Sequence, residues 1–207
     1  MPRKEPRPLK RRGPVKDEKY VIALFCEGAA TEPQYFQALA KLPEIREKTN
    51  LDLRIDLTGA VPLTLVQQAV SAKNNDTADA YWCIFDVEWP KQHPNLADAI
   101  QLAGKEGIPV AVSNPSFELW LVLHHKDHRS YLDTNQAIQE RKKIDGAGNK
   151  NLDPNLYLNF RSVASARAQS LTSRHEKDGN RMPHDNPSSN VYELVTAIEN
   201  PKPSVES

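Results

Sequence analysis

Two short apolar runs constrain the fold of this chain more than any other feature of its sequence. Residues 20–26 (YVIALFC) and 80–85 (AYWCIF) are continuously apolar and about as long as strands that are buried on both faces. Each run ends at an acidic residue and is followed, directly or after a loop, by a segment with helical spacing of apolar side chains. Strands that alternate with helices in this way are typical of an α/β fold with a mainly parallel sheet.

Two further strands and several helices complete the predicted core, which spans residues 20–125. Residues 51–57 alternate between apolar and polar side chains, as expected of a half-exposed edge strand. Residues 108–112 form a fourth strand, and Pro109 favours an edge position for it. We therefore predict a four-stranded, mainly parallel sheet flanked by helices at 32–42, 62–74, 96–105 and 117–125.

Residues 126–207 follow a different pattern. Helical stretches are expected near residues 133–143, 154–172 and 189–199, and polar, turn-rich segments separate them. We interpret this region as a helical C-terminal extension that packs on the core and is not a separate domain.

The net charge of zero hides an uneven distribution. Residues 1–19 contain eight basic and three acidic residues, a net charge of +5, so the remainder of the chain carries −5. This segment is also rich in proline and poor in large apolar side chains, which predicts a flexible arm. A basic arm attracts polyanions through counterion release without reading their sequence, and a solubilising leader is the alternative.

Several protein classes are excluded by composition. No window approaches the roughly 20 consecutive apolar residues that a membrane helix needs, and the charged N-terminus is unlike a signal peptide. The two cysteines, Cys26 and Cys83, are too few for a disulfide framework or a zinc ribbon. These features predict a soluble, cytoplasmic protein without a membrane partner.

Carboxylates follow the two apolar strands at the point where each ends. Glu27 comes directly after the first strand, and Asp86 and Glu88 follow the second. Parallel sheets bind ligands outside the carboxyl ends of their strands. Neighbouring strands lie about 4.8 Å apart, so the three acids would come together if the two apolar strands are adjacent. In extended backbone, Asp86 and Glu88 would point to one side. Carboxylates this close favour a divalent cation, Mg²⁺ or Mn²⁺, although capping of helices or simple solvation stays an alternative.

Four blocks of the sequence carry a family resemblance. They are EGAATEPQYF at residues 27–36, DVE at 86–88, SNPSFELWLVLH at 113–124 and, more loosely, NPSS at 186–189. Together they resemble the RloB-like protein family, whose core is similar to the Toprim domain of topoisomerases, primases and overcoming-lysogenization-defect nucleases. The resemblance extends over about residues 20–198 and implies a Toprim-like fold that acts on nucleic-acid phosphodiesters with a metal ion.

The resemblance also implies roles for individual residues. Glu27 matches the acid of the first strand, which serves as acid/base or metal ligand, and Asp86 with Glu88 matches the pair that holds Mg²⁺. Glu88 stands where that pair has a second Asp, and glutamate is one methylene longer. Proteins of this kind resemble effectors of antiphage defence that work beside a separately encoded ATPase. A separate ATPase is consistent with this chain, which has no G-x-x-x-x-G-K-[ST] loop.

Other residues of the matched blocks are candidates for assisting roles. Glu118 follows the end of another predicted strand and is taken as a third catalytic candidate with Glu27 and Asp86. Glu32 is a further candidate, and for Glu32 and Glu118 the alternative is an interaction with a helix dipole. Asn114 caps the following helix or contacts phosphate, and His124 is a candidate for proton transfer.

The predicted function is a Mg²⁺-dependent Toprim-type nuclease that acts on DNA or RNA, with tRNA among the candidates. Its partner would be the separate ATPase of a defence system, and a homo-oligomer stays open. The alternative is a non-catalytic subunit in which the Toprim fold is a regulatory or docking surface for that ATPase.

Overall fold

The computed structural model describes residues 19–57, 59–146 and 152–201. All but one residue of the predicted arm of residues 1–19 lie outside this description. The elements follow in the order β1 (Tyr20–Cys26), α1 (Thr31–Ala40), α2 (Pro43–Arg46), β2 (Leu51–Asp56), α3 (Pro62–Asn74), β3 (Ala80–Asp86), α4 (Leu96–Glu106), β4 (Val110–Asn114), α5 (Phe117–His125), α6 (Thr134–Asp145), the 3-10 turns η1 (Pro154–Leu156) and η2 (Leu158–Phe160), α7 (Arg161–Asp178), β5 (Ser188–Ser189) and α8 (Val191–Glu199).

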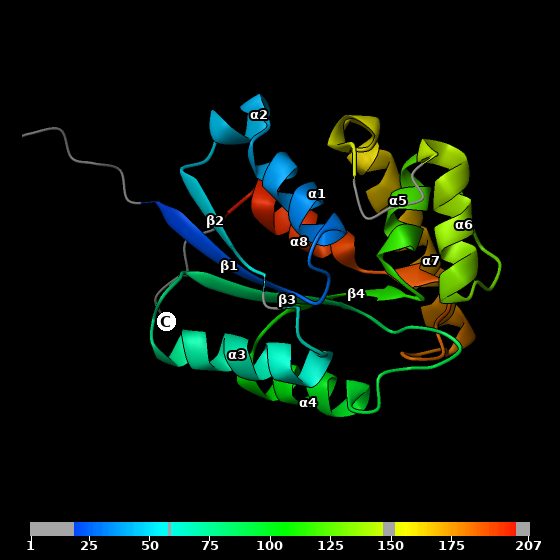
Figure 1. Cartoon of the computed structure of the whole chain (residues 1–207), viewed down its shortest axis with the longest axis horizontal. Helices are drawn as coiled ribbons and strands as arrows, with labels where there is room; N and C mark the ends of the chain where they lie inside the picture. Colours follow the sequence, from blue (N-terminus) through cyan, green and yellow to red (C-terminus); the bar gives the residue numbers. More distant parts are fainter. Residues whose placement is uncertain (1–18, 58, 147–151, 202–207) are drawn as a thin grey trace, which may run out of the picture.

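The sheet has five strands in the order β2-β1-β3-β4-β5 (Figure 1). The strands β1 to β4 are parallel, and β5 pairs with β4 in the antiparallel direction. The α/β fold with a mostly parallel sheet is therefore confirmed, whereas the predicted count of four strands is wrong. The adjacency of β1 and β3, on which the expected meeting of acids depends, is present.

The fifth strand comes from the C-terminal part of the chain. Ser189 pairs with Ser113, and Ser188 pairs with Asn114. The side chain of Asn190 extends this pairing, because it accepts from the Val112 N–H at 2.6 Å and donates to the Val110 carbonyl at 2.9 Å. Two serines carry no strand periodicity, so the pattern could not predict this strand.

One consequence of β5 concerns the position of β4. The edge position that Pro109 favoured for this strand is wrong, because β3 and β5 flank it. The Pro109 carbonyl still contributes to the sheet, since it accepts a hydrogen bond from the Cys83 N–H at 3.1 Å. A proline at the beginning of a strand removes one donor and leaves its carbonyl available, which makes the inner position tolerable.

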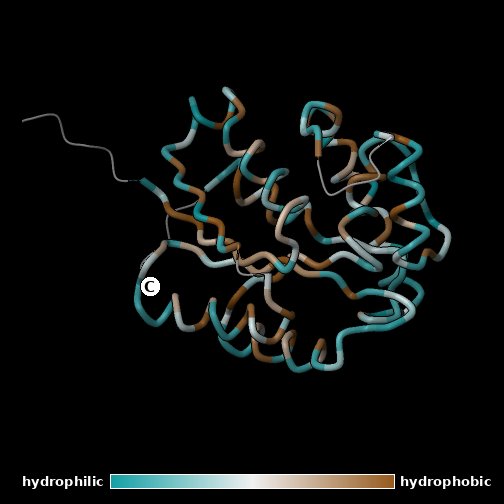
Figure 2. The backbone as a smooth tube through the Cα atoms, in the orientation of Figure 1, coloured by the Kyte–Doolittle hydropathy of each residue, from teal (hydrophilic) through white to brown (hydrophobic). Residues whose placement is uncertain are grey.

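Helices cover both faces of the sheet. Helices α3 and α4 pack against one face, where alternate side chains of the strands, such as Phe25, Cys83 and Val112, are buried. Helices α1, α5 and α8 cover the other face, where Leu24 and Ile84 belong to the larger core. Figure 2 shows the resulting distribution, with apolar colour along the central strands and hydrophilic colour on much of the outer helical surface. Burial on both faces explains why β1 and β3 are continuously apolar.

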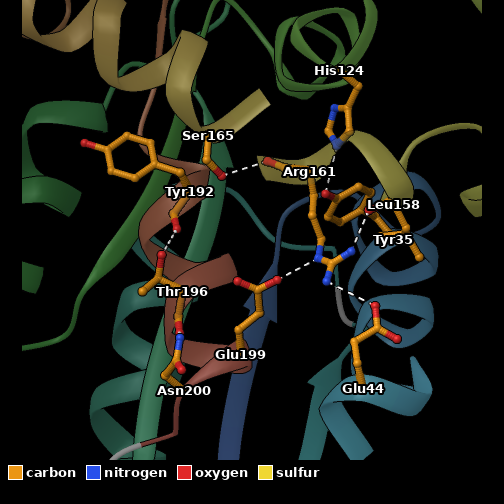
Figure 3. Close-up of polar contacts among 10 residues, drawn as sticks. All are labelled: Tyr35, Glu44, His124, Leu158, Arg161, Ser165, Tyr192, Thr196, Glu199 and Asn200. Atoms are coloured by element: carbon orange, nitrogen blue, oxygen red, sulfur yellow. Dashed lines mark hydrogen bonds and ion pairs between the residues drawn. The ribbon is translucent and has the colours of Figure 1, made fainter. Parts of the chain in front are cut away.

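Helices α5, α6 and α7 lie together beyond the carboxyl ends of β3 and β4, on the right of Figure 1. Arg161 at the beginning of α7 braces this group against the rest of the molecule (Figure 3). Its Nε donates to Glu199 of α8 at 2.6 Å, and its Nη2 donates to Glu44 of α2 at 3.1 Å. In the described parts of the chain, no helix is both long and apolar enough to cross a lipid bilayer.

Candidate functional site

Glu27 joins the ends of β1 and β3. Its backbone N–H donates to the Ile84 carbonyl at 3.0 Å, which continues the pairing of the two strands by one residue. Its Oε2 then accepts from the Asp86 N–H at 3.1 Å. Burial raises the pKa of the Glu27 carboxyl, while the Asp86 N–H and the nearby His93 act in the opposite direction. The glutamate is thus held across the sheet edge by backbone that the apolar strands position.

Asp86, the last residue of β3, lies among other carboxylates. Burial raises its pKa well above the usual value, and the charges of Glu32, Glu118 and Glu27 raise it further. The Phe117 N–H at the beginning of α5 donates to the Asp86 carboxyl and acts in the opposite direction. The carboxylates whose charges act on Asp86 therefore come from segments that follow β1 and β4, and we call Glu27, Glu32, Asp86 and Glu118 the carboxylate cluster.

Glu88 reaches the same region by a route that differs from the prediction. The strand ends at Asp86, and Glu88 has a φ of 60°, so the extended backbone that was expected to align the two side chains is absent. The Glu88 N–H donates to the Pro115 carbonyl at 2.9 Å, which fixes the turn. A left-handed conformation is costly for a non-glycine residue and is typical of sites where the surrounding structure imposes it.

His93 lies between two of the acids, and the sequence analysis missed it. Its Nε2 is 2.6 Å from Oε1 of Glu27 and 3.7 Å from Oε2 of Glu88. The residue belongs to the loop that connects β3 to α4, where no periodicity relates it to the strand ends. The only signal in the sequence is its proximity to the Asp86-Val87-Glu88 block, and proximity alone does not define a geometry.

Glu118 connects the carboxylate cluster to the C-terminal helices. The Ser116 hydroxyl donates to its Oε2 at 2.7 Å, and Nη1 of Arg141 lies 3.8 Å from its Oε1. Arg141 is only 4% exposed, and its Nε donates to Asp145 at 2.9 Å. Sequence reasoning also missed Arg141, although its i+4 spacing from the buried Ala137 indicates the inner face of α6.

Gly28 makes room for Glu32. A Cβ atom built on Gly28 would overlap the carboxyl group of Glu32, which is 7% exposed in the first turn of α1. A glycine directly after Glu27 therefore lets the Glu32 side chain fold back toward the strand end. This contact, and not a special backbone angle, accounts for glycine at this position.

Whether a divalent cation fits this site can be judged from the ligand atoms that the acids offer. The carboxylate oxygens of Glu27, Asp86 and Glu88 are the ligand type that Mg²⁺ and Mn²⁺ prefer. Within the described residues, no group of three or more His, Cys, Asp or Glu side chains is already arranged to hold a metal ion. Instead, the ring nitrogen of His93 lies against Glu27 and Glu88, so metal binding by these acids requires their side chains to rearrange.

Comparison with protein families identifies the chain. The model of a family described as RloB-like protein matches residues 22–198. The chain belongs to the RloB-like protein family. No curated protein matches it. Among solved structures, it is similar to an ABC transporter solute binding protein from Bacillus halodurans C-125 with bound myo-inositol, at 11% identity and a TM-score of 0.35, over 91% of this chain and 92% of that chain. A similarity at this level supports no conclusion about the fold or ligands of this RloB-like chain.

Asn114, a candidate for capping or phosphate contact, has a different environment in this RloB-like protein. Its Nδ2 donates to the Pro183 carbonyl at 3.0 Å and to Asp185 at 2.7 Å. Its Oδ1 accepts from Trp89 Nε1 at 2.8 Å and from Asn186 Nδ2 at 3.1 Å. Both amide donors and both lone pairs of the oxygen are engaged, so the side chain links three segments of the chain. It makes no side-chain cap for α5, whose N-cap residue is Ser116.

His124, the candidate for proton transfer, lies in the core at the far end of α5 from Glu118. It is 2% exposed, and its ring stacks edge-on against Tyr35, Trp120 and Tyr157. Nδ1 lies 2.8 Å from the Trp120 carbonyl, and Nε2 lies 3.0 Å from the Tyr35 hydroxyl (Figure 3). Because a carbonyl can only accept, Nδ1 carries the proton and the Tyr35 hydroxyl donates to Nε2. Both ring nitrogens are therefore engaged away from the carboxylate cluster.

Proposed function

We propose that this RloB-like protein is a divalent-cation-dependent nuclease of Toprim-like architecture that hydrolyses phosphodiester bonds in nucleic acid. The observation that carries the proposal is that Glu27 accepts from the Asp86 N–H at 3.1 Å and that the charges of Glu27, Glu32 and Glu118 all act on the Asp86 carboxyl. Such a cluster costs free energy in the protein alone, because burial and mutual repulsion both disfavour the ionised forms. A divalent cation would relieve that cost, and nucleic-acid chemistry commonly needs one.

In this proposal, Glu27, Asp86 and Glu88 would hold Mg²⁺ or Mn²⁺, which polarises the phosphodiester and stabilises the charge that develops on it. Glu27 would take a proton from the attacking water as the water oxygen bonds to phosphorus. The bond between phosphorus and the ester oxygen breaks, the leaving oxygen takes a proton from solvent, and Glu27 returns its own proton to solvent. The raised pKa of Glu27 suits this role, because proton transfer is most effective when the pKa approaches the working pH. Glu118 and Glu32 complete the negative environment that retains the ion.

We further propose that the protein is the effector of an antiphage defence system and works with a separately encoded ATPase. The family membership supports this assignment, and the absence of a G-x-x-x-x-G-K-[ST] loop from the sequence is consistent with a separate source of ATP binding.

A specific observation supports a second candidate function. His93 already lies against Glu27 and Glu88, and the described residues contain no ready-made metal site. In this alternative the fold is a non-catalytic docking or regulatory surface for the ATPase.

The test is cleavage of labelled tRNA, single-stranded DNA and plasmid with Mg²⁺, Mn²⁺ or EDTA, with and without the ATPase. Asp86→Asn and Glu27→Gln should each lower the cleavage rate at least about 100-fold, since each removes a charge from the reacting centre. Glu193→Gln is the matched control, because burial also raises the pKa of Glu193, which lies on α8 outside the cluster. Cleavage that both cluster variants retain would refute the assigned site, and absence of cleavage under every condition would favour the docking function.

A further inference from the structure

An aromatic pair lies next to the candidate site and has no part in the chemistry proposed above. Trp89 directly follows Glu88 in the chain. The ring of Tyr131 packs against it at a centroid distance of 6.4 Å with an interplanar angle of 65°. Tyr131 is 57% exposed, which is the largest exposed fraction among the large hydrophobic side chains of the described residues. A large, outward-facing aromatic ring that packs on the residue after Glu88 is a candidate contact for substrate.

The structure holds Trp89 firmly in place. Its indole Nε1 donates to Asn114 at 2.8 Å. Its backbone N–H donates to the Thr134 hydroxyl at 3.0 Å, and its carbonyl accepts from the Thr134 N–H at 3.1 Å. Trp89 also packs against the core below the sheet together with Met182. A ring that is fixed in this way loses little conformational entropy when it binds a flat ligand, because its position is already set.

The loop that carries Tyr131 also borders a basic pocket. Arg129, Arg174 and Lys177 line a surface pocket of about 280 Å³ along α7. The loop is attached to α7 because Nη1 of Arg174 donates to the Arg129 carbonyl at 2.9 Å. Asp127 lies 2.9 Å from Arg129, and Asp178 lies 3.8 Å from Arg174, so these two acids neutralise part of the charge. Lys177 also lines this pocket, beside Asp178, and lysine side chains are common contacts for phosphate groups.

We infer that the exposed ring of Tyr131, supported edge-on by Trp89, is a stacking platform for an unpaired base of single-stranded nucleic acid, whose backbone continues toward the pocket of Arg129, Arg174 and Lys177. Aromatic side chains beside positive charges are the usual means of holding single strands, because every base offers a flat face to stack on. Duplex DNA or RNA hides those faces. The inference rests on the proposed function for its substrate class, and it concerns binding and not the cleavage step.

Intrinsic fluorescence tests this inference directly. The chain has three tryptophans. Trp82 and Trp120 are 8% and 0% exposed, whereas Trp89 is half-buried and lies against Tyr131, so its emission reports on a base that stacks there. The full-length protein is titrated in EDTA with oligo-dT, with oligo-U and with a duplex of equal length, at a salt concentration that suppresses the contribution of the basic arm. We expect single strands to quench the fluorescence and to bind more tightly than the duplex. A difference between oligo-dT and oligo-U would show which single-stranded source is preferred.

Variants of Tyr131 separate stacking from other contacts. Tyr131→Ala should raise the Kd for single strands about ten-fold or more, whereas Tyr131→Phe should bind like the wild type, because stacking does not need the hydroxyl. Tyr131 is exposed, so its truncation should leave the fold intact. Phe160→Ala is the matched control, since Phe160 is 45% exposed at η2, and it should leave binding unchanged.

The outcomes distinguish this inference from the proposed nuclease activity. Equal binding by Tyr131→Ala and wild type, equal affinity for duplex and single strand, or no binding of single strands would each overturn the platform. Asp86→Asn should still bind single strands after losing cleavage. If no preparation cleaves nucleic acid but single-strand binding depends on Tyr131, the nuclease proposal fails and the platform stands.

Discussion

At the scale of single residues, the candidate site is a compromise between repulsion and close packing. The ionised form of Asp86 is disfavoured by burial and by the charges of three other carboxylates. The same close packing appears at Gly28, where a single hydrogen in place of a methyl group leaves space for the Glu32 carboxyl. Positions like these are unfavourable for stability and are kept where a chemical task requires them.

Gly28→Ala tests whether the position of Glu32 matters. The added methyl group must displace the Glu32 carboxyl, which can move because it is the end of a flexible side chain. We expect the protein to fold and cleavage to fall about ten-fold or more, since the field at Asp86 changes. Denaturation in urea and a cleavage assay measure the two effects.

A second glycine provides the control for this substitution. Gly104 lies in α4, and nothing lies within 4 Å of a Cβ built on it. Gly104→Ala should keep full cleavage and should stabilise the protein by about 0.5–1 kcal/mol through helix propensity. Equal cleavage by both alanine variants would show that Glu32 has no influence on the site.

His124 predicts a dependence of stability on pH. Burial lowers its pKa to about 4, so the folded state favours the neutral ring. The stabilisation that follows is present above the unfolded pKa of about 6.5 and is lost as the pH falls toward 4, up to about 3 kcal/mol in total. The free energy of unfolding, measured from pH 7 to pH 4, should therefore decrease in the wild type with a component that His124→Phe lacks.

The control for this prediction is His184→Gln, because His184 is exposed, lies outside α5 and is not among the groups that lower the pKa of His124. It should keep the component that His124→Phe loses. If the free energy of unfolding of His124→Phe falls with pH as steeply as that of the wild type, other groups cause the acid sensitivity.

At the scale of elements, α6 is coupled to the site through one buried arginine. Arg141 contacts Asp145 on its own helix and lies 3.8 Å from Glu118, so it neutralises acids that are mostly removed from water. Arg141→Met should destabilise the protein by about 3–5 kcal/mol, because it removes the cation that balances the buried Asp145 carboxylate, which then keeps the neutral Tyr157 hydroxyl. Thermal and chemical denaturation measure this loss.

The matched control is an arginine with the same i,i+4 spacing on the surface. Arg174 is 3.8 Å from Asp178 of α7, and both side chains are about half exposed. Arg174→Met should change the stability by less than about 1 kcal/mol. A similar cost for both arginines would mean that burial of the Arg141 pair is not what makes it important.

Elements also differ in how well a sequence reveals them. The runs of β1 and β3 are buried on both faces, so their apolar character alone predicts strands and, with them, the positions of Glu27 and Asp86 at the sheet edge. Strand β5 is two serines long, and its place depends on Asn190 reaching across to β4. His93 was missed for a related reason, because its contacts come from the path of a loop that no periodicity encodes.

At the scale of the whole molecule, charge is distributed unevenly along the chain. The segment of residues 1–19 carries +5 and the remainder carries −5, and four of the described acids form the carboxylate cluster at the carboxyl ends of the strands. An acidic site repels a phosphate backbone unless cations are supplied, and a basic segment attracts it over a longer range.

Deletion of residues 1–19 should therefore weaken binding of any nucleic acid and should make log K less dependent on log salt. The slope should change by roughly 0.9 for each phosphate of duplex DNA that the protein no longer neutralises. A variant with Arg7, Lys10, Arg11 and Arg12 replaced by Gln keeps the length and should show the same change. An unaltered salt dependence in both proteins would exclude the segment from binding.

Strand β5 is synthesised after the rest of the sheet. All members of the carboxylate cluster leave the ribosome early, whereas Ser188, Ser189 and the Asn190 side chain that complete β4 emerge much later. The residues that engage Asn114 beside Trp89 are equally late, because they lie at 183–186. A nascent chain therefore contains every acid of the carboxylate cluster before β4 gains its antiparallel partner β5.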